Sequence, residues 1–287
     1  MEIAGNSAHD YLPEAIERVK AKCLTVAQVL GDELMSQAVI VGGLVPTLLY
    51  LDAAPSAETG LHVGTLDLDL ALDLVILDDE RYEAISERLS RAKFSLDEKE
   101  DGRFRRQRWR SPNGILVDFL MPPVPPDNKG GRLQSLTQDL AAFTMRGLDM
   151  ALTNPVPVAL GGLDLAGRRV TRRILVCAPH VFVVLKALAI AGRDKHKDAY
   201  DIYFVLKNDE QEPSALGGLA ATLSNRDVVT EAVHLIDRDF RTVDGRGPQD
   251  VCRFLDRAED NDLAADVLAY GTAFVVGFRE VAELGES

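Results

Sequence analysis

The chain of 287 residues is poor in cysteine and in positive charge. Its three cysteines, Cys23, Cys177 and Cys252, are odd in number and far apart, which excludes a disulfide framework and the spacing of a zinc site. This cysteine usage suits a reducing compartment, so we expect a cytoplasmic protein. The net charge of −13 excludes general attraction to nucleic-acid phosphates, so any contact with RNA requires a local basic patch.

Long apolar runs are missing as well. The longest, residues 181–191, contains Lys186 and is too short to cross a bilayer. The first ten residues lack the basic and apolar regions of a signal peptide, and we expect no membrane partner. Apolar residues make up 46% and charged residues 27% of the chain, a globular balance that allows one large domain or two modest ones.

The most informative pattern that is present alternates aspartate and leucine over residues 64–74. Successive side chains of a strand point to opposite faces, so the leucines share one face and Asp67, Asp69 and Asp73 share the other. Two carboxylates at i and i+2 repel each other unless a cation lies between them, and Mg²⁺ is the usual ion for oxygen ligands. The alternative is a solvated strand face. We expect no metal contact from Asp73.

Two further features accompany this strand. Gly42 and Gly43 stand between a buried strand at 38–41 and a helix at 44–51, where a backbone without Cβ atoms can approach an anion. A plain turn is the alternative for this pair. Asp118 lies inside an apolar strand, where an acid is costly unless it is paired or bound to a metal. If that strand lies beside the Asp/Leu strand, three carboxylates converge and can hold two Mg²⁺ ions roughly 4 Å apart.

The remaining periodicity predicts an α+β protein with a mixed N-terminal half and a mostly helical C-terminal half. Ser111 to Gly114 supply the turn of a hairpin between two strands. Pro179 opens the helical half. The other predicted features are helices at 12–30 and 79–92, hairpin strands at 103–110 and 115–121, a linker at 121–132, short strands within 156–177, and loops near 208–218 and 244–248.

These motifs resemble known enzymes when they are taken in order. Val41-Gly42-Gly43, Thr65-Leu66-Asp67-Leu68-Asp69-Leu70 and Val117-Asp118-Phe119 resemble the pattern of the DNA polymerase β-like nucleotidyltransferase superfamily. Lys186 to Arg193 and Lys197-Asp198-Ala199-Tyr200-Asp201 resemble the downstream pattern of the AbiEii-type nucleotidyltransferases, toxins related to the MenT enzymes. The resemblance covers about residues 35 to 207.

The resemblance implies a fold and a reaction. It implies a nucleotidyltransferase palm, a small mixed β-sheet with flanking helices, at 1–125, then a linker with short strands at 126–178 and a helical domain at 179–287. The implied reaction is attack of an acceptor hydroxyl on the α-phosphate of an NTP, with release of pyrophosphate. The implied acceptor is the 3′ end of tRNA or another RNA, and the implied setting is a toxin with a cognate antitoxin.

The resemblance also implies residue roles. Asp67, Asp69 and Asp118 would bind two Mg²⁺ ions, and Asp118 could also accept the proton of the attacking hydroxyl. Lys186 would neutralise phosphate; the alternative is a lysine that extends to solvent. The implied nucleotide contacts are Gly42, Gly43, Thr65, Arg193, Asp198 and Asp201. Many relatives carry serine at or after the second glycine, whereas here Leu44 follows Gly43, and Thr47 or Thr65 would have to substitute.

A basic segment precedes Asp118. Residues 103–110 contain five arginines, with Phe104 and Trp109 between them, in an otherwise acidic protein. Arginines interleaved with aromatic residues can bind phosphates and stack on bases, so we expect contact with RNA or with the triphosphate. The alternative is an edge strand protected by charge. The arginines are Arg103, Arg105, Arg106, Arg108 and Arg110.

Two other functions remain open from the sequence. A protein of this fold without catalytic activity could bind a nucleotide or a partner, as the missing serine would allow. A transferase acting on a cationic small molecule, as aminoglycoside nucleotidyltransferases do, would suit the acidic surface.

Overall fold

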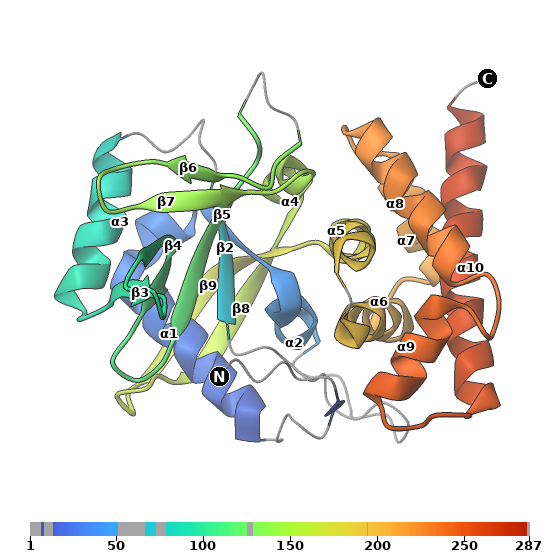
Figure 1. Cartoon of the computed structure of the whole chain (residues 1–287), viewed down its shortest axis with the longest axis horizontal. Coiled ribbons are helices and arrows are strands. Elements are labelled where there is room, and N and C mark those ends of the chain that lie inside the picture. The colour runs from blue at the N-terminus through green and yellow to red at the C-terminus, as the bar shows by residue number, and fades with distance from the viewer. Residues whose placement is uncertain are drawn as a thin grey trace. The chain divides into compact units, whose positions relative to one another are not determined.

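The computed structural model describes residues 7–8, 14–50, 67–72, 79–124, 129–193 and 195–285, without the side chains of residues 14–16, 67, 72 and 79. It divides into two compact units (Figure 1). The sheet unit comprises Glu14–Leu49 and Gly64–Ala178, and the helical unit includes Tyr50 and Pro179–Ser287.

The sheet unit is built on a mixed sheet that contains nine strands among the described residues, with the order β3-β4-β5-β2-β1-β9-β8 and the pair β6–β7 joined to β5 (Figure 1). Strands β2 and β5 run parallel, as do β1 and β9, whereas β4–β5 and β8–β9 are antiparallel. The strands are β1 Ala38–Val41, β2 Asp67–Leu72, β3 Ser95–Glu98, β4 Phe104–Arg110, β5 Leu116–Met121, β6 Leu133–Ser135, β7 Ala141–Thr144, β8 Pro155–Leu163 and β9 Arg169–Cys177.

The centre of this sheet is apolar for reasons visible in the sequence. Strand β1 is buried along its whole length and reads Ala-Val-Ile-Val, the continuous apolar run typical of a strand covered on both faces. Leu68 and Leu70 of β2 are buried beside Val117 and Phe119 of β5, their register neighbours. The alternating aspartates therefore lie on the opposite face from this core.

Helices of the sheet unit cover the sheet and connect its strands. The longest, α1, packs against β8 and β9 and buries Val19, Cys23, Val26 and Leu30, which recur at helical spacing. A left-handed residue, Gly31 with φ of +80°, kinks α1 where the predicted helix ends. The elements are α1 Glu14–Met35, the 3₁₀ helix η2 Gly42–Leu44, α2 Val45–Leu49, α3 Asp79–Arg91 and α4 Leu148–Thr153.

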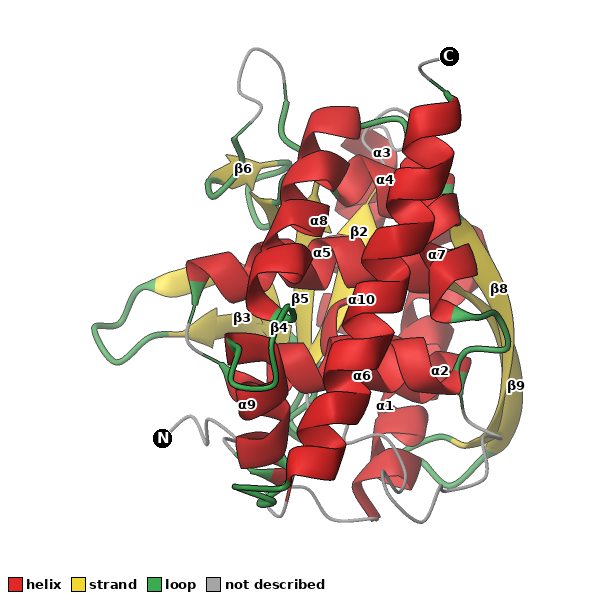
Figure 2. Ribbon diagram, turned by 90° about the vertical axis from the view of Figure 1, so that its right-hand side faces the viewer, coloured by secondary structure: helices red, strands yellow, loops and turns green. Residues whose placement is uncertain are grey.

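The helical unit contains α5 Pro179–Gly192, α6 His196–Asn208, α7 Pro213–Ala221, α8 Arg226–Asp239, α9 Arg246–Phe254 and α10 Asn261–Leu284. The long α10 packs closely along α7 (Figure 2), and glycine makes this approach possible. A Cβ on Gly217 would lie 1.9 Å from the carbonyl oxygen of Phe274. Within the described part of the chain, no helix combines the length and apolarity needed to span a membrane.

The predicted α+β class is confirmed, and several details of the prediction need correction. The segment predicted at 126–178 as a linker with short strands contains β6 to β9 and α4, which belong to the sheet unit. The loop predicted near 208–218 ends earlier, since Pro213 begins α7, and the loop predicted at 244–248 gives way to α9 at Arg246. Short edge strands such as β3 carry too few residues for periodicity to reveal them.

Candidate active site

A row of charged side chains crosses three neighbouring strands of the sheet unit. In the register of the sheet, Arg108 of β4 lies opposite Asp118 of β5, and Asp118 lies opposite Asp69 of β2. Residues opposite each other on adjacent strands present their side chains to the same face. The structure thus brings Asp69 and Asp118 together, as the sequence predicts.

The glycine turn meets this row at Asp69. Gly42 follows β1 with φ of +73°, a conformation that L side chains rarely adopt. A Cβ at this position would lie 2.0 Å from Oδ2 of Asp69, so the carboxylate occupies the space that any other residue would fill. Gly43 and Leu44 are buried in η2, and Thr47 is buried in α2. Glycine is therefore required at position 42 by both backbone conformation and close contact.

The donor chemistry of this face fits a hard cation. Asp69 and Asp118 offer carboxylate oxygens, the ligands that Mg²⁺ prefers. Among the described side chains no group of three His, Cys, Asp or Glu residues surrounds a metal position. The side chain of Asp67 lies outside the described atoms, and Thr65 lies outside the described residues altogether. The roles predicted for Asp67 and Thr65 therefore stay predictions.

Asp118 already has a cationic partner within the protein. Nε of Arg108 donates to Oδ1 of Asp118 at 2.8 Å, and Nη2 donates to Oδ2 at 2.6 Å. This fork geometry is the strong, two-point form of an arginine–carboxylate pair. The sequence shows Arg108 only as one of the arginines of the basic segment, without a sign of this pairing. Counting outward from a turn at 111–114 would place Gln107 opposite Asp118, whereas the observed register pairs Ser111 with Ile115.

The other arginines of β4 are engaged as well. Asp97 of β3, only 2% exposed, receives hydrogen bonds from Arg105 at 2.6 Å and Arg110 at 2.8 Å. Burial opposes the charge of Asp97, but these two hydrogen bonds outweigh burial and lower the pKa of its carboxyl. Arg103 pairs with Asp101 at 2.6 Å in the exposed turn.

Arg106 differs from its neighbours on β4. Its guanidinium donates to the hydroxyl of Ser135 at 3.1 Å and to the carbonyl oxygen of Thr137, and within the described residues no carboxylate pairs with it. Its Nε is buried without a hydrogen-bond partner. The positive charge of Arg106 is therefore the least neutralised of the five.

The helical unit gathers the downstream motif into a buried ion cluster. Nζ of Lys186, on α5, lies 2.7 Å from Oδ1 of Asp198 and 2.7 Å from Oδ2 of Asp201, both on α6. Arg193 donates to the two oxygens of Asp198 at 2.6 Å and 2.9 Å. Lys186 is 7% exposed, so it does not extend to solvent. The structure thus brings Lys186, Arg193, Asp198 and Asp201 together, as a group within this unit.

Lys197 is a further member of the cluster, present in the downstream motif of the sequence but without a predicted role. It is 1% exposed and lies 2.5 Å from Oδ1 of Asp201. Burial and the neighbouring Lys186 lower the pKa of Lys197 to about 8, against the opposing effect of Asp201. Burial also acts against the charge of Lys186, but Asp201 and Asp198 outweigh it and raise the pKa of Lys186. The pKa values of the two lysines thus shift in opposite directions, because burial dominates at Lys197 and the two aspartates dominate at Lys186.

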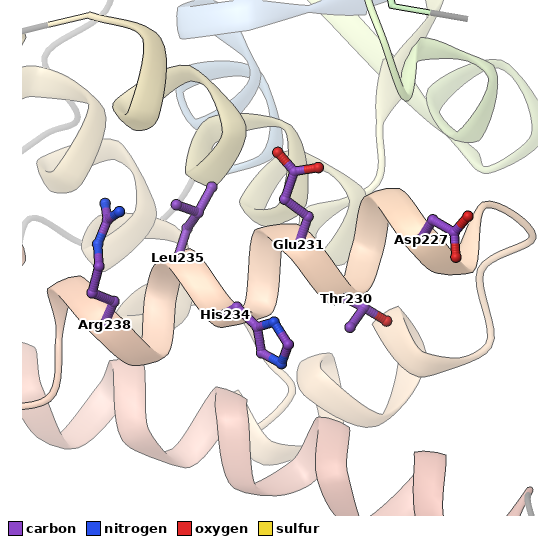
Figure 3. A pocket seen from close by; sticks show the side chains of 6 residues that line it. All are labelled: Asp227, Thr230, Glu231, His234, Leu235 and Arg238. Carbon is purple, nitrogen blue, oxygen red and sulfur yellow. The ribbon is translucent and has the colours of Figure 1, made fainter.

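A surface pocket of the helical unit holds none of the predicted site residues. It is lined from α8 alone, by Asp227, Thr230, Glu231, His234, Leu235 and Arg238 (Figure 3). These side chains carry charges of both signs along one amphipathic helix and do not point toward a common ligand position.

A glycine turn and paired carboxylates on neighbouring strands of a mixed sheet define the class: a nucleotidyltransferase-like palm. Residues 25–213 match the model of a protein family described as nucleotidyltransferase, and the chain belongs to that family. The activity of this class is transfer of a nucleoside monophosphate.

Comparison with solved structures finds an antigenic nucleotidyltransferase-like protein from Paracoccidioides brasiliensis. The two sequences are 15% identical, the match covers 74% of this chain and 92% of that chain, and the TM-score is 0.38. A search among curated proteins gave no match.

Proposed function

We propose that the protein is a Mg²⁺-dependent nucleotidyltransferase that moves an NMP from an NTP to an acceptor hydroxyl of RNA, the 3′ end of tRNA first among the candidates. The observation that carries this proposal is the placement of Asp69 and Asp118 in register on neighbouring strands, with Gly42 packed against Asp69. In a member of a nucleotidyltransferase family, this is where carboxylates for a metal and a backbone for phosphate are expected.

The chain's own residues would act as follows. Asp67 and Asp69 hold the Mg²⁺ that binds the triphosphate, and the ion supplies charge neutralisation at the reacting phosphate. The turn at Gly42 and Gly43 would present backbone N–H groups to phosphate oxygens, next to the Asp69 carboxylate that fills the space at Gly42. Asp118, fixed by Arg108, completes the acidic face.

The helical cluster adds cationic side chains to the proposal. Lys186 and Arg193 are proposed phosphate contacts, oriented by Asp198, which binds both of them. Asp201 forms ion pairs with both Lys186 and Lys197. Asp198 and Asp201 thus act as positioning residues, and without them the side chain of Lys186 would lose the contacts that hold it in place.

RNA is the proposed acceptor because of the basic strand β4. Of the five arginines at 103–110, four bond carboxylates, which leaves Arg106 as the first residue to test. We also propose, from the resemblance to AbiEii-type enzymes, that the protein acts as a toxin with a cognate antitoxin. A small regulator-like reading frame beside the gene, together with growth arrest on expression of the protein alone, would support the toxin role.

The test is label transfer. The protein is incubated with each α-³²P-labelled NTP and Mg²⁺, separately with tRNA, with total RNA, with an aminoglycoside and with no added acceptor. The proposal predicts label in RNA from at least one NTP and none after EDTA treatment. Label confined to the aminoglycoside would decide for the small-molecule enzyme, and tight NTP binding without any transfer would decide for a binding protein.

A further inference from the structure

The cation that faces Asp118 belongs to the protein itself. Both oxygens of the Asp118 carboxylate accept hydrogen bonds from Arg108, at 2.8 Å and 2.6 Å. The pair is shielded from water, with side chains 18% and 10% exposed. The strands hold the two residues opposite each other, so the pairing is built into the register of β4 and β5. Asp118 therefore reaches the acidic face with its charge already balanced.

This pairing bears on how many metal ions the site accepts. In a two-ion site, Asp67 and Asp69 suffice for the ion that carries the triphosphate, and Asp118 is the ligand that distinguishes the second ion. A dication bound to Asp118 would share the carboxylate with a guanidinium, and like charges repel strongly where water is largely excluded. Breaking the pair to admit the ion would give up two charge-assisted hydrogen bonds between largely shielded side chains, which is costly.

We propose that Arg108 takes the place of the second metal ion, so that the site binds one Mg²⁺, at Asp67 and Asp69, while Arg108 stays on Asp118. This inference rests on the proposed function, and it replaces by one ion the two Mg²⁺ ions that the sequence resemblance implies. Three carboxylates are then balanced by one dication and one guanidinium, without a second dication. Arg108 acts as a positioning residue for Asp118 and as a fixed positive charge on the acidic face.

The test counts bound ions with Mn²⁺ as the probe. Free Mn²⁺ is measured by electron paramagnetic resonance during titration of the full chain, in the presence of the α,β-methylene analogue of each NTP. The wild-type protein is expected to bind one ion, with any second ion weaker by at least about 100-fold. Arg108→Met removes the charge but keeps an unbranched side chain, and it is expected to bind two ions.

Two variants control this result. Arg106→Met removes a guanidinium two positions along the same strand, one that bonds Ser135 and Thr137 rather than Asp118, and it is expected to bind one ion. Arg108→Lys keeps the charge at Asp118 and is also expected to bind one. Circular dichroism establishes that each variant is folded, and if Arg108→Met does not fold, the wild-type and Arg108→Lys counts decide.

Two comparably bound ions in the wild-type protein would overturn the inference, and so would one ion in folded Arg108→Met. A wild-type protein that binds two ions and transfers label would overturn the inference alone. A protein that binds no Mn²⁺ with any analogue and transfers no label would overturn the proposed function as well.

Discussion

At the scale of single residues, the candidate site depends on positions where one residue determines the place of a neighbouring side chain. Gly42 leaves room for the carboxylate of Asp69, and Arg108 holds that of Asp118. In the helical unit, Asp198 and Asp201 hold two buried lysines. Each of these arrangements makes a measurable prediction.

Gly42→Ala should impair both stability and activity. Alanine at φ of +73° is strained, by about 1–2 kcal/mol of unfolding free energy, and its Cβ would displace the Asp69 carboxylate. Gly114→Ala is a matched control, since Gly114 has φ of +75° in the hairpin turn and nothing lies within 4 Å of its Cβ position. Denaturant unfolding should show a loss of stability in both variants, larger in Gly42→Ala because of the contact with Asp69, while label transfer should fall only in Gly42→Ala. Equal transfer by both variants would contradict the role given to this contact.

Lys197 should give the protein a pH-dependent stability. Its pKa is lowered to about 8 by burial and Lys186, so between that value and about 10.5, the usual value for lysine, the unfolded chain holds more protons. Its contribution to the unfolding free energy therefore rises with pH in that window. Urea unfolding should show that the unfolding free energy rises between pH 7.5 and 9.5, and that this rise is smaller in Lys197→Met than in wild type by about 1–2 kcal/mol. An equal rise in the two proteins would show that Lys197 keeps its ordinary pKa.

At the scale of elements, the hairpin of β4 and β5 places the charged residues of the sheet unit's candidate site. Its turn brings the basic strand beside Asp118, and Asp97 ties the edge strand β3 to β4 through two arginines. The acids of β3 and β5 therefore neutralise much of the charge that the sequence assigns to an RNA surface.

Asp97→Ala should destabilise the protein, by about 1–3 kcal/mol, because two arginines lose a buried acceptor. Asp101→Ala, which frees only the exposed Arg103, should change little. The folded-state pKa of Asp97 is lowered, so its contribution is present above the unfolded value of about 3.9 and is lost as the pH falls through the folded value. The difference between wild type and Asp97→Ala in denaturant unfolding should therefore shrink in acid; a constant difference would contradict the ion-pair explanation.

The sequence predicts these elements unevenly, for physical reasons. The alternation of β2, the turn of the β4–β5 hairpin and the proline that begins α5 are local signals, and the structure contains each of them. The pairing of Asp69 with Asp118 follows once β2 and β5 are neighbours. The edge strand β3 and the pair β6–β7 are stabilised by partners distant in sequence, so local pattern does not reveal them. The partners of Arg108 and Lys197 likewise depend on register and burial.

At the scale of the whole molecule, the family match and the two units do not coincide. The match covers residues 25–213, which takes in the sheet unit's described strands together with α5 and α6, and it ends where α7 begins. The predicted catalytic residues all fall inside the match, and α7 to α10 lie outside it. With a net charge of −13, any binding of RNA requires a local basic patch, so the proposed RNA binding should weaken steeply with salt.

The central claim is that Asp69 holds the metal ion required for nucleotidyl transfer, and one variant tests it most directly. Asp69→Asn keeps the shape of the side chain and removes its charge, so Mg²⁺-dependent transfer of label from α-³²P NTP should fall at least about 1,000-fold, while the denaturation midpoint stays near that of wild type. Asp101→Asn, an exposed carboxylate in the same unit, should leave transfer unchanged. Transfer by Asp69→Asn within about tenfold of the wild-type rate would contradict the account.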